Sequence, residues 1–343
     1  MTQLPSDTIP PAAVPENLSI ELTTRCTNNC THCFARAGRD ADAELDAATA
    51  RQVIGEGARL GYTGLHLTGG EPFLYPGIFD LLDYAVSAGY TSYFVNTNGT
   101  LITADVAARL ANYGDGLNIS LSLQGPEELH DRVRGRGAFR AAVAGLERAL
   151  EAGVGVFVFA AAGTALLAAL PRFAEFLFTA YPAVRELTLI QLIRVPGDAR
   201  DLSADLLSPG DFTAMVRMTA LLNLFGYRVS VLQNPLATAV SRALGMPWVP
   251  PAVPLYRPGA LVVMADRTIT LAHSARESFG SYEPGMLSRV LESAEYRIAT
   301  GPDDEACGPC RHFGICRENG MIRPSEWFRD REDGEPFCKR VMG

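Results

Sequence analysis

The feature that most constrains this chain is a group of three cysteines near its start. Cys26, Cys30 and Cys33 follow an apolar run in a C-x3-C-x2-C spacing. A structural zinc site uses four protein ligands and a cubane cluster has four irons, so three cysteines leave either a missing ligand or one open iron. An open iron can bind a substrate or cofactor. The alternatives are a disulfide with a spare thiol, or zinc completed by His32 or a distant residue.

A second group of cysteines lies at the other end of the chain. It consists of Cys307, Cys310, Cys316 and Cys338, and no cysteine occurs between the two groups. Four thiols suffice for a closed site that holds either zinc or a [4Fe-4S] cluster, and the spacing alone does not distinguish these two. Cysteines grouped in this way fit metal ligation better than a disulfide framework, which predicts a cytoplasmic protein.

Strand-like runs alternate with amphipathic helical stretches over the front part of the chain. The strands are expected at residues 18–23, 64–68, 92–96, 117–123, 154–159 and 186–193. The helices are expected at residues 47–60, 78–88, 104–113, 138–152 and 170–179. Repeated units of this kind build a parallel sheet with right-handed crossovers. We therefore predict an α/β fold, a partial (β/α)6 TIM-like barrel with ligand sites at the carboxyl ends of the strands.

One stretch has the apolar character of a membrane span. Residues 154–170 carry no charge, but an expected turn at residues 161–163 divides them into a buried strand and a helix that ends at Pro171. The net charge of -8 gives no general attraction to nucleic acid or to anionic lipid. We therefore expect neither a membrane nor a nucleic acid as partner. Residues 1–16 lack the features of a signal peptide and are expected to be extended.

The C-x3-C-x2-C motif after a first strand, followed by G-G-E-P after the second, resembles the radical S-adenosylmethionine superfamily. The resemblance implies that the open iron binds S-adenosylmethionine, which is cleaved to a 5'-deoxyadenosyl radical that takes hydrogen from a substrate. It also implies that His32 lies near the adenine. The segment expected to hold the methionine amino group is Gly69, Gly70, Glu71 and Pro72.

Later motifs resemble the SPASM-type branch of the same superfamily. Ser122 would contact the ribose or carboxylate of the cofactor, and Arg134 its carboxylate, as suits a bidentate cation. By the same resemblance Asn98 and Gln191 would also contact the cofactor. Gln124 stands where the family has Asp, which puts any acidic role there in doubt. The expected substrate contacts are Gln124, Arg194 and Tyr256.

The spacing C-x2-C-x5-C plus a distant cysteine resembles the auxiliary-cluster module called SPASM, or its shorter twitch form. Metal chemistry alone favours zinc for short C-x2-C ribbons, and the resemblance reverses that preference. The fuller pattern has further cysteines where this chain has Gly320 and residues 272–274. We therefore predict one auxiliary [4Fe-4S] cluster, and two clusters in total. The predicted domains are an extended segment 1–16, a barrel 17–200, a helical linker 201–258 and an auxiliary-cluster domain 259–343. Within the last of these, a hairpin is expected at residues 261–272 and a helix at residues 287–299.

The expected activity is that of a radical S-adenosylmethionine enzyme with an electron donor such as flavodoxin or ferredoxin. Because residues 1–16 are too few to form a leader-binding domain, a small polar metabolite is the first hypothesis. It would be a sugar, aminocyclitol or nucleoside of specialised metabolism such as antibiotic biosynthesis, with dehydration or a cytosylglucuronate-type decarboxylation as candidate reactions. A maturase of a ribosomally made peptide is the alternative. A non-catalytic iron-sulfur or zinc scaffold is a third reading, and no catalytic acid or base is assigned.

Overall fold

The computed structural model describes residues 17–193, 201–274, 278–324 and 336–343. Their strands form one sheet in the order β7-β6-β5-β4-β3-β2-β1-β8-β9. The strands are β1 (Asn17–Glu21), β2 (Gly64–Thr68), β3 (Ser92–Thr97), β4 (Leu117–Ser122), β5 (Gly155–Ala162), β6 (Glu186–Gln191), β7 (Val229–Val231), β8 (Leu261–Val263) and β9 (Ile269–Thr270).

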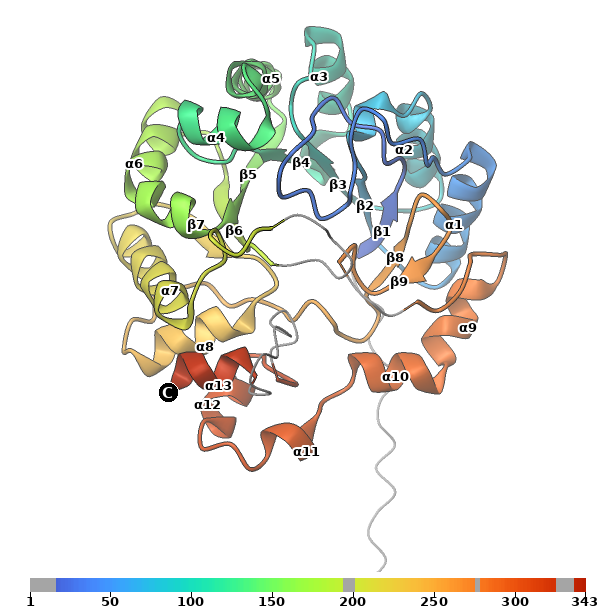
Figure 1. Cartoon of the computed structure of the whole chain (residues 1–343). Helices are drawn as coiled ribbons and strands as arrows, with labels where there is room; N and C mark the ends of the chain where they lie inside the picture. The colour runs from blue at the N-terminus through green and yellow to red at the C-terminus, as the bar shows by residue number, and fades with distance from the viewer. Residues whose placement is uncertain (1–16, 194–200, 275–277, 325–335) are drawn as a thin grey trace, which may run out of the picture.

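The sheet is parallel from β7 through β8, and only β9 runs antiparallel to its neighbour. Each strand from β2 to β7 is added beside the one that precedes it in sequence, and helices cover the outside of the resulting half-ring (Figure 1). This arrangement confirms the predicted α/β partial barrel. The six expected strands are β1 to β6, and β7 and β8 extend the sheet at its two sides.

Helices of the barrel and of the C-terminal part follow the strands in chain order. Those of the barrel region are α1 (Ala47–Arg59), α2 (Ile78–Ser87), α3 (Ala104–Ala111), α4 (Glu127–Arg134), α5 (Ala138–Glu151), α6 (Thr164–Ala180), α7 (Pro209–Leu224) and α8 (Pro235–Ala243), with short 3-10 turns η1 (Pro72–Leu74) and η2 (Gly114–Gly116). The C-terminal helices are α9 (Met286–Glu292), α10 (Ala294–Thr300), α11 (Asp304–Cys307), α12 (Phe313–Glu318) and α13 (Phe337–Met342).

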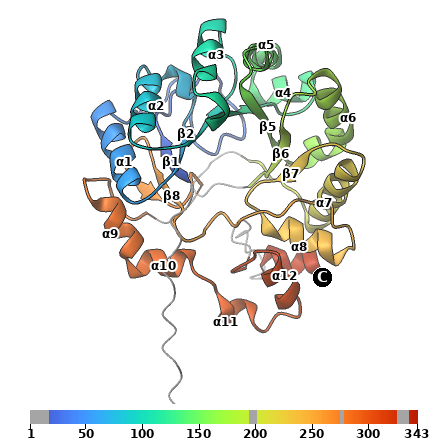
Figure 2. The same cartoon turned by 180° about the vertical axis from the view of Figure 1, so that it is seen from behind.

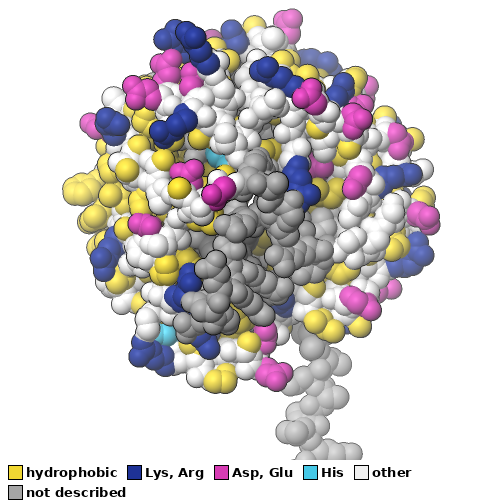
Figure 3. Space-filling model, viewed as in Figure 1, with side chains coloured by type: hydrophobic (Ala, Val, Ile, Leu, Met, Phe, Trp, Pro, Cys, Tyr) yellow, Lys and Arg dark blue, Asp and Glu magenta, His cyan; other side chains and the backbone are white. Residues whose placement is uncertain are grey.

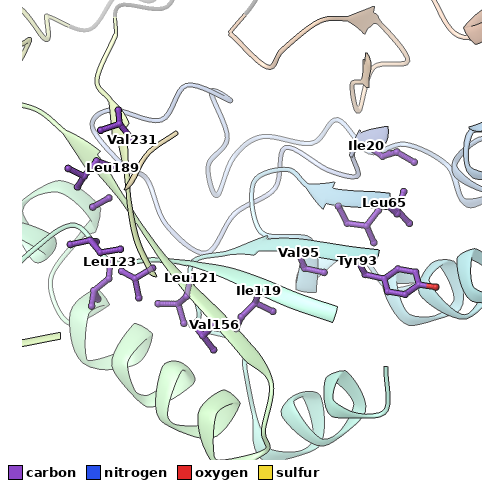
Figure 4. Close-up of a cluster of buried hydrophobic side chains, with 14 of the residues drawn as sticks. Ile20, Leu65, Tyr93, Val95, Ile119, Leu121, Leu123, Val156, Leu189 and Val231 are labelled. Atoms are coloured by element: carbon purple, nitrogen blue, oxygen red, sulfur yellow. The ribbon is translucent and has the colours of Figure 1, made fainter. Parts of the chain in front are cut away.

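The core lies between the sheet and the outer helices. Leu65, Val95, Ile119 and Val156 are fully buried there, on consecutive strands (Figure 4). Because side chains alternate between the two faces of a strand, the residues between them point to the opposite side. We call that side the inner face. Its side chains are half-buried along β5, which alternates strictly between half-buried and buried positions.

The apolar stretch at residues 154–170 differs from its prediction. β5 continues to Ala162, and α6 passes through Pro171 without ending there. A proline inside a helix removes one hydrogen bond and costs about 3 kcal/mol. The buried side chains on both sides of Pro171, among them Leu170, Phe173 and Leu177, supply packing that outweighs this cost. Within the described ranges, no helix is both long and apolar enough to traverse a membrane.

The C-terminal part spans the two edges of the half-ring. α9 contacts α1 at one edge, and α12 and α13 contact α8 and α7 at the other (Figure 2). A hairpin of β8 and β9 joins the barrel sheet through β1, although we had expected it in a separate domain. The division into domains at residues 16, 200 and 258 therefore stays a proposal, and the sheet crosses the last two boundaries.

The surface facing the viewer in Figure 3 carries side chains of both charge signs in an interspersed pattern. No broad patch of one sign is visible among the coloured residues of that face. The net charge of the whole chain is -8.

Candidate cofactor and cluster site

The first three cysteines lie on the loop between β1 and α1. Backbone hydrogen bonds shape this loop: Cys26 N–H donates to Gly38 O at 2.9 Å, and Cys33 N–H donates to Cys30 O at 3.3 Å. Cys26 is buried, whereas Cys30 and Cys33 are half-buried. All seven cysteines of the chain fall within the described residues and none forms a disulfide. The alternative of a disulfide with a spare thiol is therefore excluded in this structure.

The sulfur of Cys26 receives hydrogen bonds from two nitrogen donors. Asn28 N–H lies 3.4 Å and Asn98 Nδ2 lies 3.6 Å from Sγ. Burial raises the pKa of the Cys26 thiol to about 11, so a bound metal has to supply the driving force for the thiolate. Asn98, expected to touch the cofactor, also donates to Thr27 Oγ1 at 2.9 Å. In this structure Asn98 contacts Cys26 and Thr27, and its contact with the cofactor stays a prediction.

Gly69 and Gly70 allow a close backbone approach, but the approaching segment belongs to the chain itself. A Cβ atom on Gly69 would lie 2.4 Å from Thr23 O, and one on Gly70 would lie 2.2 Å from Arg25 O. Gly70 N–H donates to Thr23 O at 2.6 Å and Glu71 N–H to Arg25 O at 2.9 Å. The paired glycines therefore fasten the end of β2 to the segment that leads into the cysteine loop.

Glu71 joins the ends of β2 and β3. Its carboxylate is fully buried and accepts hydrogen bonds from Thr97 Oγ1 at 2.8 Å, Asn98 N–H at 2.8 Å and Phe73 N–H at 3.3 Å. Burial raises the pKa of this carboxyl to about 7. Pro72 starts η1, where a missing N–H costs nothing. Both residues position the strand ends around the loop.

Arg134 provides a cation with an unused donor. It is the last residue of α4, and its Nε is buried without a hydrogen-bond partner in the described structure. A buried donor without a partner costs about 1–3 kcal/mol, which an anionic ligand would recover. Arg134 also lies near enough to Glu71 to lower the pKa of that carboxyl against the larger effect of burial. Ser122 ends β4 and is half-buried.

Gln124 and Gln191, two of the predicted contact residues, form hydrogen bonds within the chain. Gln124 exchanges two hydrogen bonds with the backbone of Ala161, with Nε2 donating at 2.6 Å and Oε1 accepting at 3.0 Å. This pairing joins the end of β4 to β5, and the substrate contact of Gln124 stays a prediction. Gln191 accepts a hydrogen bond from Asn234 at 2.9 Å and is 7% exposed.

Of the other candidates, His32 is half-buried on the cysteine loop. Tyr256 is partly buried and packs against the hydrophobic core. Arg194 lies outside the described residues. The ligand roles of these three side chains therefore stay predictions.

The second cysteine group gathers around one cavity. Its lining includes the four cysteines Cys307, Cys310, Cys316 and Cys338, together with the cations Arg317, Arg323 and Lys339. Burial, followed by the charge of neighbouring thiols, raises the pKa of Cys307 and of Cys316 to about 11. Within the part of the chain that is described, no three Cys, His, Asp or Glu side chains stand close enough to hold a single metal ion.

A polar row on the inner face was missed from the sequence. Ser19, His66, Asn96 and Ser120 lie on β1, β2, β3 and β4 and are linked by hydrogen bonds. The signal was present in the strand G-L-H-L-T, where His66 alternates with two fully buried leucines. A polar residue at that position faces away from the helix-covered side.

Comparison with known proteins agrees with this architecture. The family model described as "Radical SAM superfamily" matches residues 20–165. "Mycofactocin maturase MftC" of Mycobacterium tuberculosis is 34% identical over 325 residues, which cover 89% of this chain and 78% of that protein.

Two solved structures share the fold at low sequence identity. "Native anSMEcpe with bound AdoMet and Cp18Cys peptide" superposes with a TM-score of 0.72 at 17% identity, covering 95% of both chains. "Streptococcus suis SuiB bound to precursor peptide SuiA" superposes with a TM-score of 0.69 at 15% identity, covering 90% of this chain and 72% of that one. With the similarity to MftC over most of the chain, these findings place it among the radical SAM enzymes, whose cofactors are S-adenosylmethionine and a [4Fe-4S] cluster. The chain therefore belongs to the radical SAM superfamily and carries the C-terminal cysteines of its SPASM-type branch.

Proposed function

We propose that this enzyme is a maturase that modifies a ribosomally made peptide. The observation that carries the proposal is the similarity to MftC, which is named a maturase, over 89% of the chain. Two further enzymes with this fold hold peptides in their solved structures. The barrel alone serves many radical SAM reactions, so a match that extends through the C-terminal part is the more informative one.

The first hypothesis from the sequence, a small polar metabolite, is contradicted by these relatives. It rested on the shortness of residues 1–16, taken as too few to bind a leader peptide. That reasoning assumed that a maturase must recognise its peptide through a domain of its own chain. A peptide can instead be presented by a separate protein or bound directly by the barrel.

For the cofactors, we propose that Cys26, Cys30 and Cys33 hold the [4Fe-4S] cluster. When bound, this cluster supplies the electron that splits S-adenosylmethionine and yields a 5'-deoxyadenosyl radical. Arg134 Nε and the Ser122 hydroxyl would bind the cofactor carboxylate, since Arg134 has a buried donor without a partner in the described structure. Carbonyl groups of the Gly69–Pro72 segment would accept hydrogen bonds from its ammonium group.

We also propose an auxiliary [4Fe-4S] cluster on Cys307, Cys310, Cys316 and Cys338. The four thiols line one cavity. Their C-x2-C-x5-C spacing with a distant fourth cysteine resembles the auxiliary-cluster module, which supports a cluster rather than zinc. Arg317 and Lys339 in the lining would offset the negative charge of a thiolate-bound cluster. A flavodoxin or ferredoxin is proposed as electron donor.

The test uses the anaerobically reconstituted full chain with dithionite and S-adenosylmethionine. The wild type should release 5'-deoxyadenosine and contain roughly eight irons. Cys30→Ala should lose this activity and roughly four irons. Cys316→Ser should also lose roughly four irons but keep cleavage of S-adenosylmethionine in the absence of substrate. Iron near four per wild-type chain, accompanied by zinc, would contradict the auxiliary cluster.

The substrate class is tested with peptides encoded beside the gene and with deuterated sugars and nucleosides. The proposal expects one peptide to change mass in a reaction that depends on S-adenosylmethionine. Transfer of deuterium from a sugar or nucleoside into 5'-deoxyadenosine, with every peptide unchanged, would refute it.

A further inference from the structure

Hydrogen bonds join the members of the polar row on the inner face. Ser19 Oγ lies 3.0 Å from His66 Nδ1, and the Asn96 side chain forms a hydrogen bond with the same ring. Ser120 Oγ in turn donates to Asn96 Oδ1. Because each member is held by its neighbour on the next strand, the row fixes the orientation of the His66 ring and keeps this part of the inner face rigid.

Aromatic rings lie beside this row on the same face. The ring centroid of Phe94 lies 6.4 Å from that of His66, 5.3 Å from Phe157 and 6.4 Å from Phe159. All four rings are half-buried, so part of each stays accessible on the inner face. We call the polar row and these aromatic rings together the wall. It combines aromatic surface with neutral polar groups.

His273 packs against this wall and next to the cysteine loop. Its ring lies edge-on to His66 with centroids 6.4 Å apart, and to Phe34 at 5.8 Å. Phe34 directly follows Cys33, so His273 lies between the cysteine loop and the inner face. The Nε2 atom of His273 is buried and has no hydrogen-bond partner in the described structure. A buried polar atom without a partner costs about 1–3 kcal/mol, which a ligand can recover.

We propose that the inner face beside His273 binds an uncharged side chain of the substrate, and that His273 Nε2 forms a hydrogen bond with the polar group of that side chain. This inference rests on the proposed function, because it describes which residue of a peptide is presented to the cluster. Phe34, whose ring lies edge-on to that of His273, is 40% exposed.

The restriction to uncharged groups follows from the surroundings of the two imidazoles. Burial, followed by the neighbouring His66, lowers the pKa of His273 to about 3, and burial lowers that of His66. Both rings are therefore neutral at pH 7, and among the described residues no carboxylate opposes these shifts. Glu21 lies two residues beyond Ser19 on β1 but is only 2% exposed, with Oε1 accepting from Ala265 N–H at 3.3 Å. A charged side chain bound beside the imidazoles would lose its hydration without gaining an opposite charge.

The test uses four probes of one shape: toluene, p-cresol, 4-methylbenzoate and 4-methylbenzylammonium. Binding to the reconstituted protein is followed by NMR of its 15N-labelled histidine rings, and His273→Phe assigns the His273 signal. Wild type should bind p-cresol at least about tenfold more tightly than either charged probe. His273→Phe keeps a ring against Phe34. It should weaken the binding of p-cresol about fivefold, which is the contribution of one neutral hydrogen bond, and leave the binding of toluene unchanged.

Two variants separate a contact from a structural role. His273→Gln keeps a polar group and should regain part of the p-cresol affinity. Phe94→Leu removes one aromatic ring of the wall and leaves the hydrogen bond to His273 in place. It should therefore weaken the binding of toluene and of p-cresol alike. With deuterated p-cresol, 5'-deoxyadenosine formed by the wild type should contain deuterium, which places the probe beside the cofactor.

Equal losses of toluene and p-cresol in His273→Phe, equal binding of charged and neutral probes, or no binding of any probe would overturn the assignment. The probes do not involve a peptide. Failure of every peptide to react would therefore count against the proposed function alone, whereas failure of the probe series would count against His273 alone.

Discussion

Glu56 connects the barrel to the C-terminal part through four hydrogen bonds. It lies in α1 with 4% of its surface exposed. Its Oε2 accepts from Tyr282 Oη and Gly285 N–H, both at 2.9 Å, and its Oε1 accepts from Leu287 N–H at 2.9 Å and Ser288 N–H at 3.3 Å. The carboxylate thus binds the start of α9, where backbone N–H groups have no partner inside the helix.

Glu56→Gln replaces one of these acceptor oxygens with an NH2 group. Whichever way the amide turns, two of the four donors face a group that cannot accept. A hydrogen bond to a charged group contributes about 1.5–3 kcal/mol. The Tyr282 hydroxyl can rotate, and a neutral amide is cheaper to bury than a carboxylate. We therefore expect the free energy of unfolding to fall by about 3 kcal/mol.

Glu147→Gln is the matched control. Glu147 is also a helical glutamate that accepts a hydrogen bond from a tyrosine hydroxyl, Tyr181 Oη at 2.9 Å, but it is exposed. Exposed polar contacts contribute little, so this variant should lose less than about 1 kcal/mol. Urea unfolding of the reconstituted chain measures both losses, and hydrogen exchange at the Leu287 and Ser288 amides locates the effect.

In Glu56→Gln these two amides should exchange about a hundredfold faster, as about 3 kcal/mol of local opening implies. The reasoning is refuted if both variants shift the urea midpoint equally. It is also refuted if exchange at the start of α9 stays at the wild-type rate.

Two further predictions concern the cofactor site. Gly70→Ala places a Cβ 2.2 Å from the backbone oxygen of Arg25 and should displace the cysteine loop. The iron bound per chain should therefore fall by roughly four. In the control Gly77→Ala the new Cβ meets only the Tyr75 ring at 3.5 Å, so this variant should keep its iron. Arg134→Gln should raise the Kd for S-adenosylmethionine about 10- to 100-fold, because an ion-paired hydrogen bond is lost. Arg134→Lys should retain the affinity for S-adenosylmethionine only in part. Arg132→Gln, an exposed change on the same helix, should leave the Kd unaltered. Equal Kd values for the Arg134 and Arg132 variants would contradict the assigned role.

Local pattern predicted most of the barrel. Expected strands and helices agree with β1 to β6 and with α1, α2, α3 and α5 to within a few residues. The reason is that their apolar residues recur at the period of the element and glycines with positive φ, such as Gly61, Gly89 and Gly153, end the helices. The pattern failed where packing outweighed a local rule, as at Pro171 inside α6.

A second failure concerns residues 287–299, expected to form one helix. The structure has α9 and α10, divided at Ser293, whose side chain caps α10 by accepting from Tyr296 N–H at 3.1 Å. Serine favours such a cap over a helix interior because its hydroxyl competes for backbone donors. The signal for this break is local, because it lies in Ser293 itself.

The sequence by itself determined the family, the two cysteine groups and the parallel barrel, because ligand spacing and strand-helix periodicity are properties of neighbouring residues. Only the tertiary structure decided that β8 lies beside β1, that Gln124 is bound to Ala161, and that His273 faces His66 across more than two hundred residues of chain. Such contacts join segments far apart in sequence, and the free energy that selects them comes from burial and hydrogen bonding in the folded state.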